Sequence, residues 1–502
     1  MNKGDHVSPV SSEFQPARPS VVLAELEARV ARELSLLDMP HAPWIPPQGD
    51  PNNGDVLDAV VIGGGVTGLA AASSLLLRGV NKLLVLDRNP PGAEGPWATS
   101  ARMKTLRTAK SGMGPTPGVP SLSPRAWYEA TYGAEAWEDI TFFPLNDWVE
   151  YLRWFKEVLG LPVQNNADVV DVEALSNGWL RLTAEVDGVT RLVTARRVIV
   201  CTGYGGWGGA RLPAVLQDLP KKLYAHSSES IDFRALEGLR VGILGVGASA
   251  IDNASTALEH GAASVDFYVR RRSVPTLHRA KALINVGCIE GFGYMEGETR
   301  FEFLRLLQAD GAPPPAHSVQ RLREAGSHRL HLGSDITAVN ADGDSLTLWA
   351  NGQPHSLDFL ISATGFEVDG RRRPEWQRLL PSMKFVGDDP ELPERARQAF
   401  AHHPAVDRDY RILEAVPGTC PGLRNVFVLA DAAIPSQGVG AVSVIGAAAV
   451  AAHAATAVIG TLFAEDSALH LNKMNDYCEP EYAVDDWPDP VESANPASTG
   501  RA

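Results

Sequence analysis

Two glycine-rich turns in this sequence each follow a short apolar stretch and precede a helical one. The first turn extends from Gly63 to Gly68, with the sequence Gly-Gly-Gly-Val-Thr-Gly. Its first glycine permits a tight turn, Gly65 lets the backbone approach a pyrophosphate, and its last glycine lets the helix pack on the strand. Asp87 ends the next apolar stretch, where a carboxylate accepts hydrogen bonds from ribose hydroxyls. The sequence therefore predicts a dinucleotide site that includes Gly63, Gly65, Gly68, Asp87 and Arg88.

The second turn differs from the first in the charge that follows it. It extends from Gly245 to Ala250 as Gly-Val-Gly-Ala-Ser-Ala, and the strand after it is followed by Arg270, Arg271 and Arg272. Guanidinium groups pair with a ribose 2′-phosphate, which a carboxylate would repel. The alternative is that the arginines form a solvated basic patch. We predict an NADPH site, rather than an NADH site, formed by Gly245, Gly247, Ser249, Ala250, Arg270 and Arg271.

The difference between the turns assigns FAD to the first one. A further apolar strand, within 423–431, ends in Asp431 before a helix of small residues. In flavoproteins with two dinucleotide sites, an aspartate at this place reaches the ribityl chain of FAD. A helix that begins after Gly438 and Gly440 would direct its positive end at the flavin pyrimidine and stabilise reduced flavin. Gln437, just before these glycines, is a candidate for contact with the flavin edge.

The two turns belong to an internal duplication. In each copy, a strand, a glycine turn, a helix and a second strand are followed by β-rich sequence and an apolar strand that ends in Thr-Gly. The predicted fold class is α/β, with two Rossmann-like dinucleotide-binding domains, each with a β-meander, the second inserted into the first. The predicted divisions are an N-terminal helical extension and Pro-rich linker at 1–54, the FAD domain at 55–205 and 358–468, the NADPH domain at 206–357, and an acidic, extended C-terminal tail at 469–502.

Composition restricts the partners. The 502 residues carry a formal net charge of −15, which argues against nucleic acid or an anionic membrane surface as a partner. The four cysteines are scattered and include no CxxC pair, so we expect neither a disulfide framework nor a reactive dithiol. The apolar stretch 426–463 contains Asp431, Pro435 and His453, which favours a buried helix over a membrane span. A cytoplasmic protein is expected, and a homo-oligomer is compatible with the sequence.

Beyond the glycine turns, two segments carry a resemblance to a known family. The chain resembles the class B flavoprotein monooxygenases over roughly 55–465. Residues 247–250 are similar to the small-Ser-Ala turn of that class, and 144–154 resemble the Tyr-Leu-Arg-Trp helix of the siderophore ornithine and lysine N-hydroxylases. The Phe-x-Gly-x-x-x-His fingerprint of the Baeyer–Villiger and flavin-containing groups is broken, because Pro220 and Lys222 replace its Phe and Gly. Flavin-dependent urate hydroxylation is one specific activity found among the related oxidoreductases of this class.

The resemblance implies an FAD-dependent, NADPH-using monooxygenase that inserts one oxygen atom from O₂ into a small molecule. NADPH would reduce the flavin, which would form a C4a-(hydro)peroxide with O₂ and oxygenate an amine nitrogen, a sulfur or an activated carbon. Such chemistry needs no triad or metal, and the histidines have no ligand-like spacing. Two other classes remain open. One is a reductase that passes electrons to a ferredoxin or quinone, and the other is a non-catalytic flavoprotein.

The stretch 97–110 is expected to contact substrate and flavin. The resemblance implies this, because proteins of that family place there the loop that crosses the flavin ring. Its candidates are Trp97, Arg102, Lys104 and Arg107, of which the cationic ones could anchor an anionic substrate or the nicotinamide dinucleotide. A solvated basic loop explains the same residues equally well. Catalytic residues are otherwise unassigned by the sequence.

Overall fold

The computed structural model describes residues 21–50, 54–112, 114–309 and 311–483. Its larger sheet has the strand order β7-β4-β3-β10-β9-β8, with β21 paired to β10. The strands β3, β4, β7, β10 and β21 pair in parallel, whereas β8, β9 and β10 form an antiparallel meander. The bounds are β3 (Leu57–Ile62), β4 (Leu83–Leu86), β7 (Val163–Gln164), β8 (Ala167–Ala174), β9 (Leu180–Val186), β10 (Val189–Val200) and β21 (Val426–Val428).

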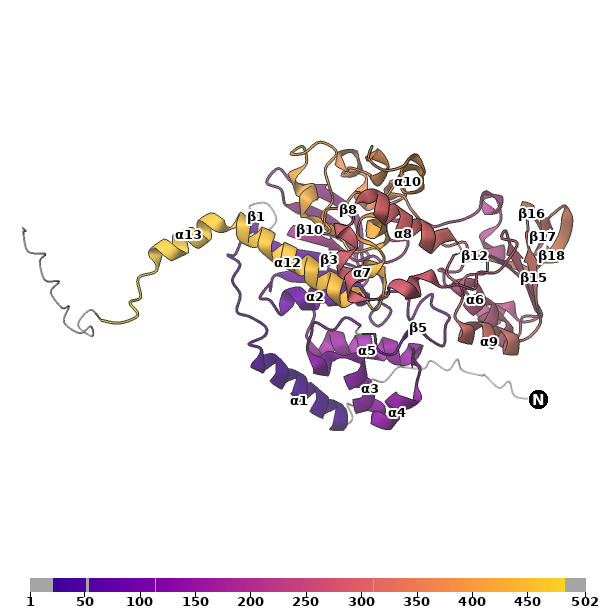
Figure 1. Cartoon of the computed structure of the whole chain (residues 1–502), viewed down its shortest axis with the longest axis horizontal. Coiled ribbons are helices and arrows are strands. Elements are labelled where there is room, and N and C mark those ends of the chain that lie inside the picture. Colours follow the sequence, from indigo (N-terminus) through magenta and orange to yellow (C-terminus); the bar gives the residue numbers. More distant parts are fainter. Residues whose placement is uncertain (1–20, 51–53, 113, 310, 484–502) are drawn as a thin grey trace, which may run out of the picture.

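A second parallel sheet repeats this plan in the order β12-β19-β13-β14-β15, and helices α6 and α9 pack together beside it (Figure 1). A three-stranded meander, β16-β17-β18, follows it in the chain. Its elements are β12 (Tyr224–His226), β13 (Arg240–Leu244), α6 (Ala248–Glu259), β14 (Ser264–Val269), α9 (Ala316–Ala325), β15 (His328–Leu332), β16 (Ile336–Asp342), β17 (Ser345–Ala350), β18 (Gln353–Leu357) and β19 (Phe359–Ser362). The predicted fold class is confirmed: two Rossmann-like domains, each with a β-meander.

One predicted boundary has to be moved. Strand β19 pairs in parallel with β12 and β13, so it belongs to the second sheet although it follows residue 357. The duplication explains this placement. In the first domain the end of β10 follows the meander and pairs with β3, and in the second domain β19 follows the meander and pairs with β13. The chain crosses between the domains on two short strands, β11 (Gly208–Ala210) and β20 (Phe366–Val368), which pair with each other. The other boundaries stay predictions.

The first domain carries most of the helices. Helix α12 packs against α2 and buries one of its faces, including Val450, Ala454 and Val458. Among the described residues, α12 is the one helix whose length and composition would suit a membrane span, and its packing on α2 favours a core helix. The bounds are α1 (Val21–Leu36), α2 (Val66–Leu76), α3 (Pro124–Tyr132), α4 (Ala134–Asp139), α5 (Leu145–Val158), α7 (Val286–Gly291), α8 (Gly297–Ala309), α10 (Glu394–Ala399), α11 (Ile434–Gln437) and α12 (Ala447–Glu465).

Helix α5 anchors an aromatic core. Trp148 and Trp154 of α5 and Trp127 of α3 are all buried. Phe143 packs edge-on against Trp148, with ring centroids 5.6 Å apart. Two short antiparallel strands, β5 (Thr105–Ala109) and β6 (Phe142–Pro144), lead from the stretch 97–110 into α5. The aromatic core therefore supports the loop that the sequence marks as a site. A further strand pair, β1 (Gly49–Asp50) and β2 (Gly54–Asp55), precedes β3.

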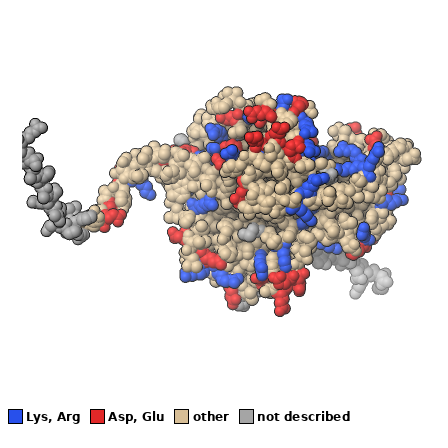
Figure 2. Space-filling view, in the orientation of Figure 1, with Lys and Arg blue, Asp and Glu red and all other residues tan. Residues whose placement is uncertain are grey.

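Charges of both signs are interspersed on the face drawn in Figure 2. Basic side chains are frequent at its right, over the second domain, and acidic ones gather at the upper and lower edges of the first domain. The net negative charge of the chain is therefore unevenly distributed on this face.

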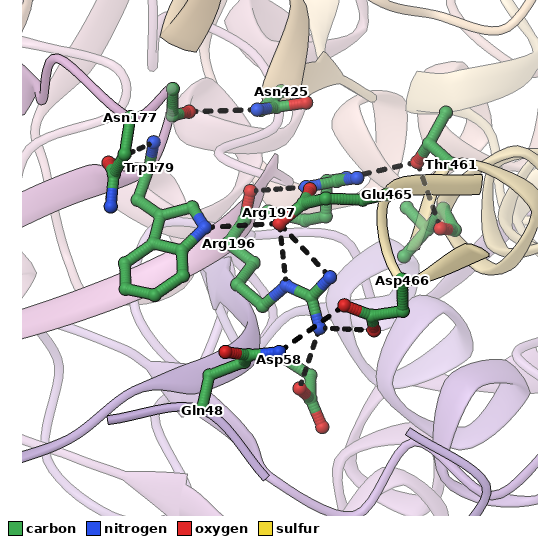
Figure 3. Close-up of polar contacts among 12 residues, drawn as sticks. Gln48, Asp58, Asn177, Trp179, Arg196, Arg197, Asn425, Thr461, Glu465 and Asp466 are labelled. Carbon is green, nitrogen blue, oxygen red and sulfur yellow. Dashed lines mark hydrogen bonds and ion pairs between the residues drawn. The ribbon is translucent and has the colours of Figure 1, made fainter. Parts of the chain in front are cut away.

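A buried ionic cluster joins the start of β3 to the end of α12 (Figure 3). The Arg196 guanidinium is fully buried and lies 2.9 Å from Asp466 and 3.0 Å from Glu465. Arg197 binds Glu465 at 2.8 Å. Burial raises the pKa of Asp58 to about 6, and the neighbouring Arg196 opposes that rise. Because buried charges need partners, this cluster fixes α12 against the sheet.

The predicted extended tail begins as a helix. Residues Ser467–Asp476 form α13, which projects from the body and has no buried residue (Figure 1). A polar, Pro- and Ser-rich composition led to the expectation of extended chain, but the prolines begin only at Pro480, after the helix ends. Residues 484–502 of the predicted tail, and 1–20 of the N-terminal extension, lie outside the described residues.

Candidate functional site

The first glycine turn connects β3 to α2 and leaves no room for side chains. Gly63 has a φ of +103°, and a Cβ atom there would lie 2.5 Å from the carbonyl oxygen of Cys201. A Cβ at Gly68 would overlap the carbonyl oxygen of Gly63. Near Gly65, by contrast, the nearest heavy atom to such a Cβ is the Cα of Gly95, at 3.5 Å. The backbone of Gly65 thus lies close to Gly95 and forms the N-cap of α2, where amide groups favour an anion.

Asp87 lies at the end of β4 and is buried. Its carboxylate accepts hydrogen bonds from the amides of Gly64 (2.7 Å) and Asn89 (2.8 Å). Burial raises the pKa of Asp87, and these two bonds oppose that rise. The Asp87 carboxylate is thus a hydrogen-bond acceptor fixed beside the turn. A small cavity next to it is lined by residues that include Gly64, Glu94, Trp97 and Lys156.

Asp431 provides a sharper test of whether a flavin fits. It follows β21, is 3% exposed, and accepts a hydrogen bond from the Gly205 amide at 2.7 Å through one carboxylate oxygen. Within the described part of the chain, its other oxygen is buried and has no hydrogen-bond partner. Burial raises the pKa of Asp431 to about 6. A buried acceptor without a partner is costly, and a ligand hydroxyl would satisfy it. The residues present therefore fit an FAD ribityl chain.

The second turn connects β13 to α6 with the same backbone geometry. Gly245 has a φ of +109°, and a Cβ there would lie 2.8 Å from the carbonyl oxygen of Ala363. A Cβ at Gly247 would meet nothing within 4 Å, so the space above the turn is open. Ala250 occupies the third small position of the turn and is fully buried. The second turn therefore presents helix amides to an open space.

The arginines after β14 are exposed on the second domain. The Arg271 guanidinium donates a hydrogen bond to the carbonyl oxygen of Ala309 at 3.1 Å. Gly311, whose would-be Cβ lies 3.3 Å from the Arg271 guanidinium, belongs to the same loop. Arg270 has no ion pair among the described residues. By strand register Arg270 corresponds to Arg88, and Val269 corresponds to Asp87. Arg270 therefore lies at the strand end where the ribose of a bound dinucleotide is expected.

The stretch 97–110 contacts the second domain through its charged side chains, although some of them, such as Lys104, are also exposed to solvent. Lys104 forms an ion pair with Glu259 at 2.9 Å, and Arg107 forms one with Asp252 at 2.6 Å. The Arg102 guanidinium donates to the carbonyl oxygen of Thr99 at 2.6 Å. These cationic groups are thus engaged by protein groups in this structure, and their roles as substrate anchors stay predictions.

Trp97 belongs to the same stretch but faces the first domain. Its indole nitrogen is buried and, among the described residues, has no hydrogen-bond partner. The ring packs edge-on against Trp148, with centroids 6.0 Å apart. A Cβ at Gly95 would lie 3.6 Å from the indole nitrogen and 3.5 Å from the Cα of Gly65. The unused donor of Trp97 therefore lies close to the first glycine turn.

Gln437 is buried and donates a hydrogen bond to the carbonyl oxygen of Asp407 at 2.6 Å. It lines a cavity of about 280 Å³, together with residues of α7, α12 and the 408–410 loop. The helix after Gly438 and Gly440 begins later than predicted, at Ala447, because a 3-10 turn over 440–442 intervenes. In the described ranges, no group of three or more His, Cys, Asp or Glu side chains could hold a metal ion.

Sequence reasoning missed three groups at these sites. The Lys156–Glu94 ion pair (2.7 Å) closes the cavity beside the first turn, and Asn165 donates to Glu94 at 3.0 Å. Asp252, buried on α6, forms an ion pair with Arg107. Each contact joins residues more than 60 positions apart, so no local spacing signals it. Only the acidic character of Asp252 near the start of α6 could have drawn attention.

The fold and the two glycine turns define a two-dinucleotide flavoprotein, and comparison with known proteins agrees. Residues 60–205 match a family model described as FAD-NAD(P)-binding, and residues 139–287 match one described as L-lysine 6-monooxygenase/L-ornithine 5-monooxygenase. The chain is 34% identical over 474 residues to the FAD-dependent urate hydroxylase of Xanthomonas campestris, covering 94% of this chain and 99% of that protein. The chain belongs to the same family of FAD-dependent flavoprotein monooxygenases.

Solved structures share the fold at lower identity. The reduced ornithine hydroxylase of Pseudomonas aeruginosa matches with a TM-score of 0.64 and 17% identity, covering 82% of this chain and 99% of that one. The ornithine N-hydroxylase of Kutzneria sp. 744, solved with reduced FAD, NADP⁺ and L-ornithine, matches with a TM-score of 0.66 and 16% identity, covering 81% and 99%. The predictions of an oxidoreductase of the monooxygenase class, with FAD and NADPH as cofactors, are confirmed.

Proposed function

We propose that this monooxygenase hydroxylates an activated carbon of a planar, nitrogen-rich heterocycle of the urate type. The observation that carries the proposal is the 34% identity to an FAD-dependent urate hydroxylase along nearly the whole of both chains. The ornithine hydroxylases match with about half that identity, which supports a common fold more than a common substrate. Among the substrate classes that the sequence left open, the purine type is therefore the leading candidate.

N-hydroxylation of an alkyl amine is the second candidate. It is favoured by the match of residues 139–287 to the lysine and ornithine monooxygenase model, a range that contains helix α5. Helix α5 lies behind the β5–β6 strands and the stretch 97–110, so any contribution to substrate selection would pass through that stretch. The two candidates differ in what the pocket must recognise: a planar ring in one case, and an amino acid with a flexible side chain in the other.

The cofactor sites are proposed as follows. The turn of Gly63, Gly65 and Gly68 would receive the FAD pyrophosphate, Asp87 the adenosine ribose, and Asp431 the ribityl chain. The second turn, with Gly245, Gly247, Ser249 and Ala250, would receive the NADPH pyrophosphate, and Arg270 and Arg271 its 2′-phosphate. The unpartnered oxygen of Asp431 and the open space at Gly247 support this arrangement.

Bound FAD would supply the hydride acceptor and the oxygen-activating centre, and the chain supplies position and a dry site. Asp431 would present its free oxygen to a hydroxyl, and the amide of Gly205 keeps that carboxylate in place. The indole N–H of Trp97 is available as a donor beside the first turn. The aromatic core around α5 would exclude water from one side of the stretch 97–110. We also propose a cytoplasmic location.

The test is a substrate comparison on the purified, FAD-loaded protein. NADPH consumption, oxygen uptake and hydrogen peroxide release are measured with urate, with other oxidised purines, and with ornithine and lysine. The proposal predicts that a purine raises NADPH consumption, lowers the fraction of oxygen released as peroxide, and yields a product that carries ¹⁸O from ¹⁸O₂. Hydroxylation of an amine alone would replace the proposal with the second candidate. NADPH oxidation that requires a ferredoxin or quinone would indicate the reductase class.

A further inference from the structure

The strand pair β5–β6 of the first domain is held against the second domain by a set of charged contacts. Figure 1 shows β5 between the helices of the first domain and the α6–α9 pair of the second. Phe142 of β6 packs on His317 of α9, with ring centroids 4.6 Å apart. Thr105 of β5 lies 3.5 Å from the His317 ring nitrogen. The strand pair therefore contacts the helices of the second domain directly.

The central contact is the ion pair of Arg107 and Asp252, at 2.6 Å. The Asp252 side chain is 1% exposed, and its second oxygen has no hydrogen-bond partner within the described residues. Arg107 is its one ion-pair partner in that part of the chain. A buried carboxylate with one cationic partner depends strongly on that partner. The orientation of α6 is therefore tied to the position of β5.

A second contact is at Glu259, about two helical turns after Asp252 on α6. Lys104 binds Glu259 at 2.9 Å, and Arg321 of α9 binds the same carboxylate at 2.8 Å. Arg321 also donates to the carbonyl oxygen of Arg102 at 2.5 Å. These groups are more exposed than Asp252, and the Lys104 side chain is 67% exposed. They support the Arg107 contact but are more accessible to water and salt, which weaken exposed pairs.

Helix α6 begins at the second glycine turn, so its orientation sets the position of that turn. Asp252 lies five residues after Gly247, and a helix of this length moves as a rigid unit. Domains within one chain move relative to each other unless a large apolar interface prevents it. Apart from the packing of Phe142 on His317, the contacts described above are polar, and polar contacts can open and close again. Whatever fixes β5 against α6 therefore fixes the second turn relative to the first domain.

We propose that Arg107 and Asp252 form an interdomain latch, which holds the second domain at the angle from which a bound nicotinamide reaches the flavin. Asp252 is then a positioning residue and Arg107 its partner, rather than an anchor for substrate. The proposal rests on the NADPH role proposed for the second turn. It explains why a carboxylate is buried on the helix that follows that turn, where negative charge would otherwise disfavour an anionic ligand.

The experiment uses the FAD-loaded full chain and three variants: Asp252→Asn, Arg107→Gln and the double variant. The control is Arg125→Gln, which removes exposed ion pairs to Glu129 and Glu138 inside the first domain. The first readout is hydrogen–deuterium exchange of β5 and α6 without NADPH. The second is the single-turnover rate of flavin reduction by saturating NADPH, measured together with the NADPH dissociation constant.

The latch predicts faster exchange in β5 and at the start of α6 in both single variants, and none in the control. It predicts flavin reduction slowed roughly 10- to 100-fold, since a misplacement of about 1 Å has effects of that size, with little change in the dissociation constant. The double variant should be no slower than either single one, because each single substitution already removes the same ion pair. Arg107→Lys, which keeps the charge, should retain most of the rate.

Two results would overturn the latch: unchanged exchange in both single variants, or slowing in the double variant that equals the product of the single effects. Failure of the proposed function is distinguishable. If NADPH does not reduce the flavin of the parent protein, the NADPH role is wrong, and the exchange data alone decide whether the domains are latched.

Discussion

The two nucleotide-binding repeats share a backbone and differ in charge. Both place a glycine with a φ near +105° between a strand and a helix: +103° at Gly63 and +109° at Gly245. After the second strand, the first repeat has the buried Asp87, held by the amides of its own turn. In the second repeat the buried Val269 takes that register position, and the exposed Arg270 follows it. The comparison teaches that backbone geometry provides a phosphate site, and that one side chain beside it selects the nucleotide.

The repeats also differ in how tightly each turn is packed. A Cβ at Gly68 would overlap the Gly63 carbonyl oxygen, whereas the equivalent Ala250 already carries a methyl group. The first turn therefore brings its helix closer to its strand than the second does.

The largest expected effect follows from this difference in packing. Gly68→Ala should destabilise the protein by about 3 kcal/mol or more and abolish FAD retention, because the new methyl group overlaps backbone atoms that cannot move away cheaply. Denaturant unfolding and the flavin content of the purified variant measure it. Ala250→Gly is the matched change in the other repeat and should cost no more than about 1 kcal/mol. Equal losses in the two variants would contradict the difference in packing.

Asp431 gives a pH-dependent prediction in the first repeat. Burial raises its pKa from 3.8 to about 6, so the native apoprotein binds an extra proton between these values and loses stability as the pH rises through them. Asp431→Asn removes this effect, and the flavin-free variant should be more stable than its parent at pH 7 by up to about 3 kcal/mol.

The gain should shrink as the pH falls from about 6 and vanish below 3.8, where the carboxyl group is protonated in both states. Chemical unfolding of the apoproteins across this range measures it. FAD affinity should change in the opposite sense, because the variant replaces a charged acceptor with a neutral one. A stability gain that is constant with pH would show that folding does not shift the pKa of Asp431.

Asp87→Ala should give protein that purifies poor in flavin. Loss of a charged hydrogen-bonding group costs about 1.5–3 kcal/mol, or roughly 10- to 100-fold in FAD affinity. The flavin-to-protein absorbance ratio after gel filtration measures it. Arg270→Gln, directly after the corresponding strand of the second repeat, serves as the control and should keep its flavin. Full flavin retention by Asp87→Ala would remove Asp87 from the FAD site.

Local patterns in the sequence were sufficient to predict the fold and the two turns. Gly63, Gly68 and Gly245 are required by backbone geometry within a few residues, and such requirements are visible in sequence. Strand β19 was assigned to the wrong domain because an apolar strand carries no information on which sheet it joins. Helix α13 was missed because composition, rather than periodicity, was used for the tail.

The contacts that arrange the site could not be predicted from the sequence, for a physical reason. Arg107 and Asp252 are 145 positions apart, and Gln437 and Asp407 meet through a backbone carbonyl that every residue has. A basic loop in sequence has the same composition whether it binds a ligand, water or another domain. Only the folded arrangement shows that Arg107 faces a buried carboxylate.

The most direct test of the central claim, that charge after the second strand selects the nucleotide in each repeat, is the rate of flavin reduction by NADPH and by NADH. It is measured as a function of cofactor concentration in the parent protein and in the Arg270→Gln/Arg271→Gln variant. We predict that the parent prefers NADPH, and that the variant has an NADPH KM raised about tenfold with the NADH KM nearly unchanged. Equal effects on both cofactors, or no effect on either, would contradict the account.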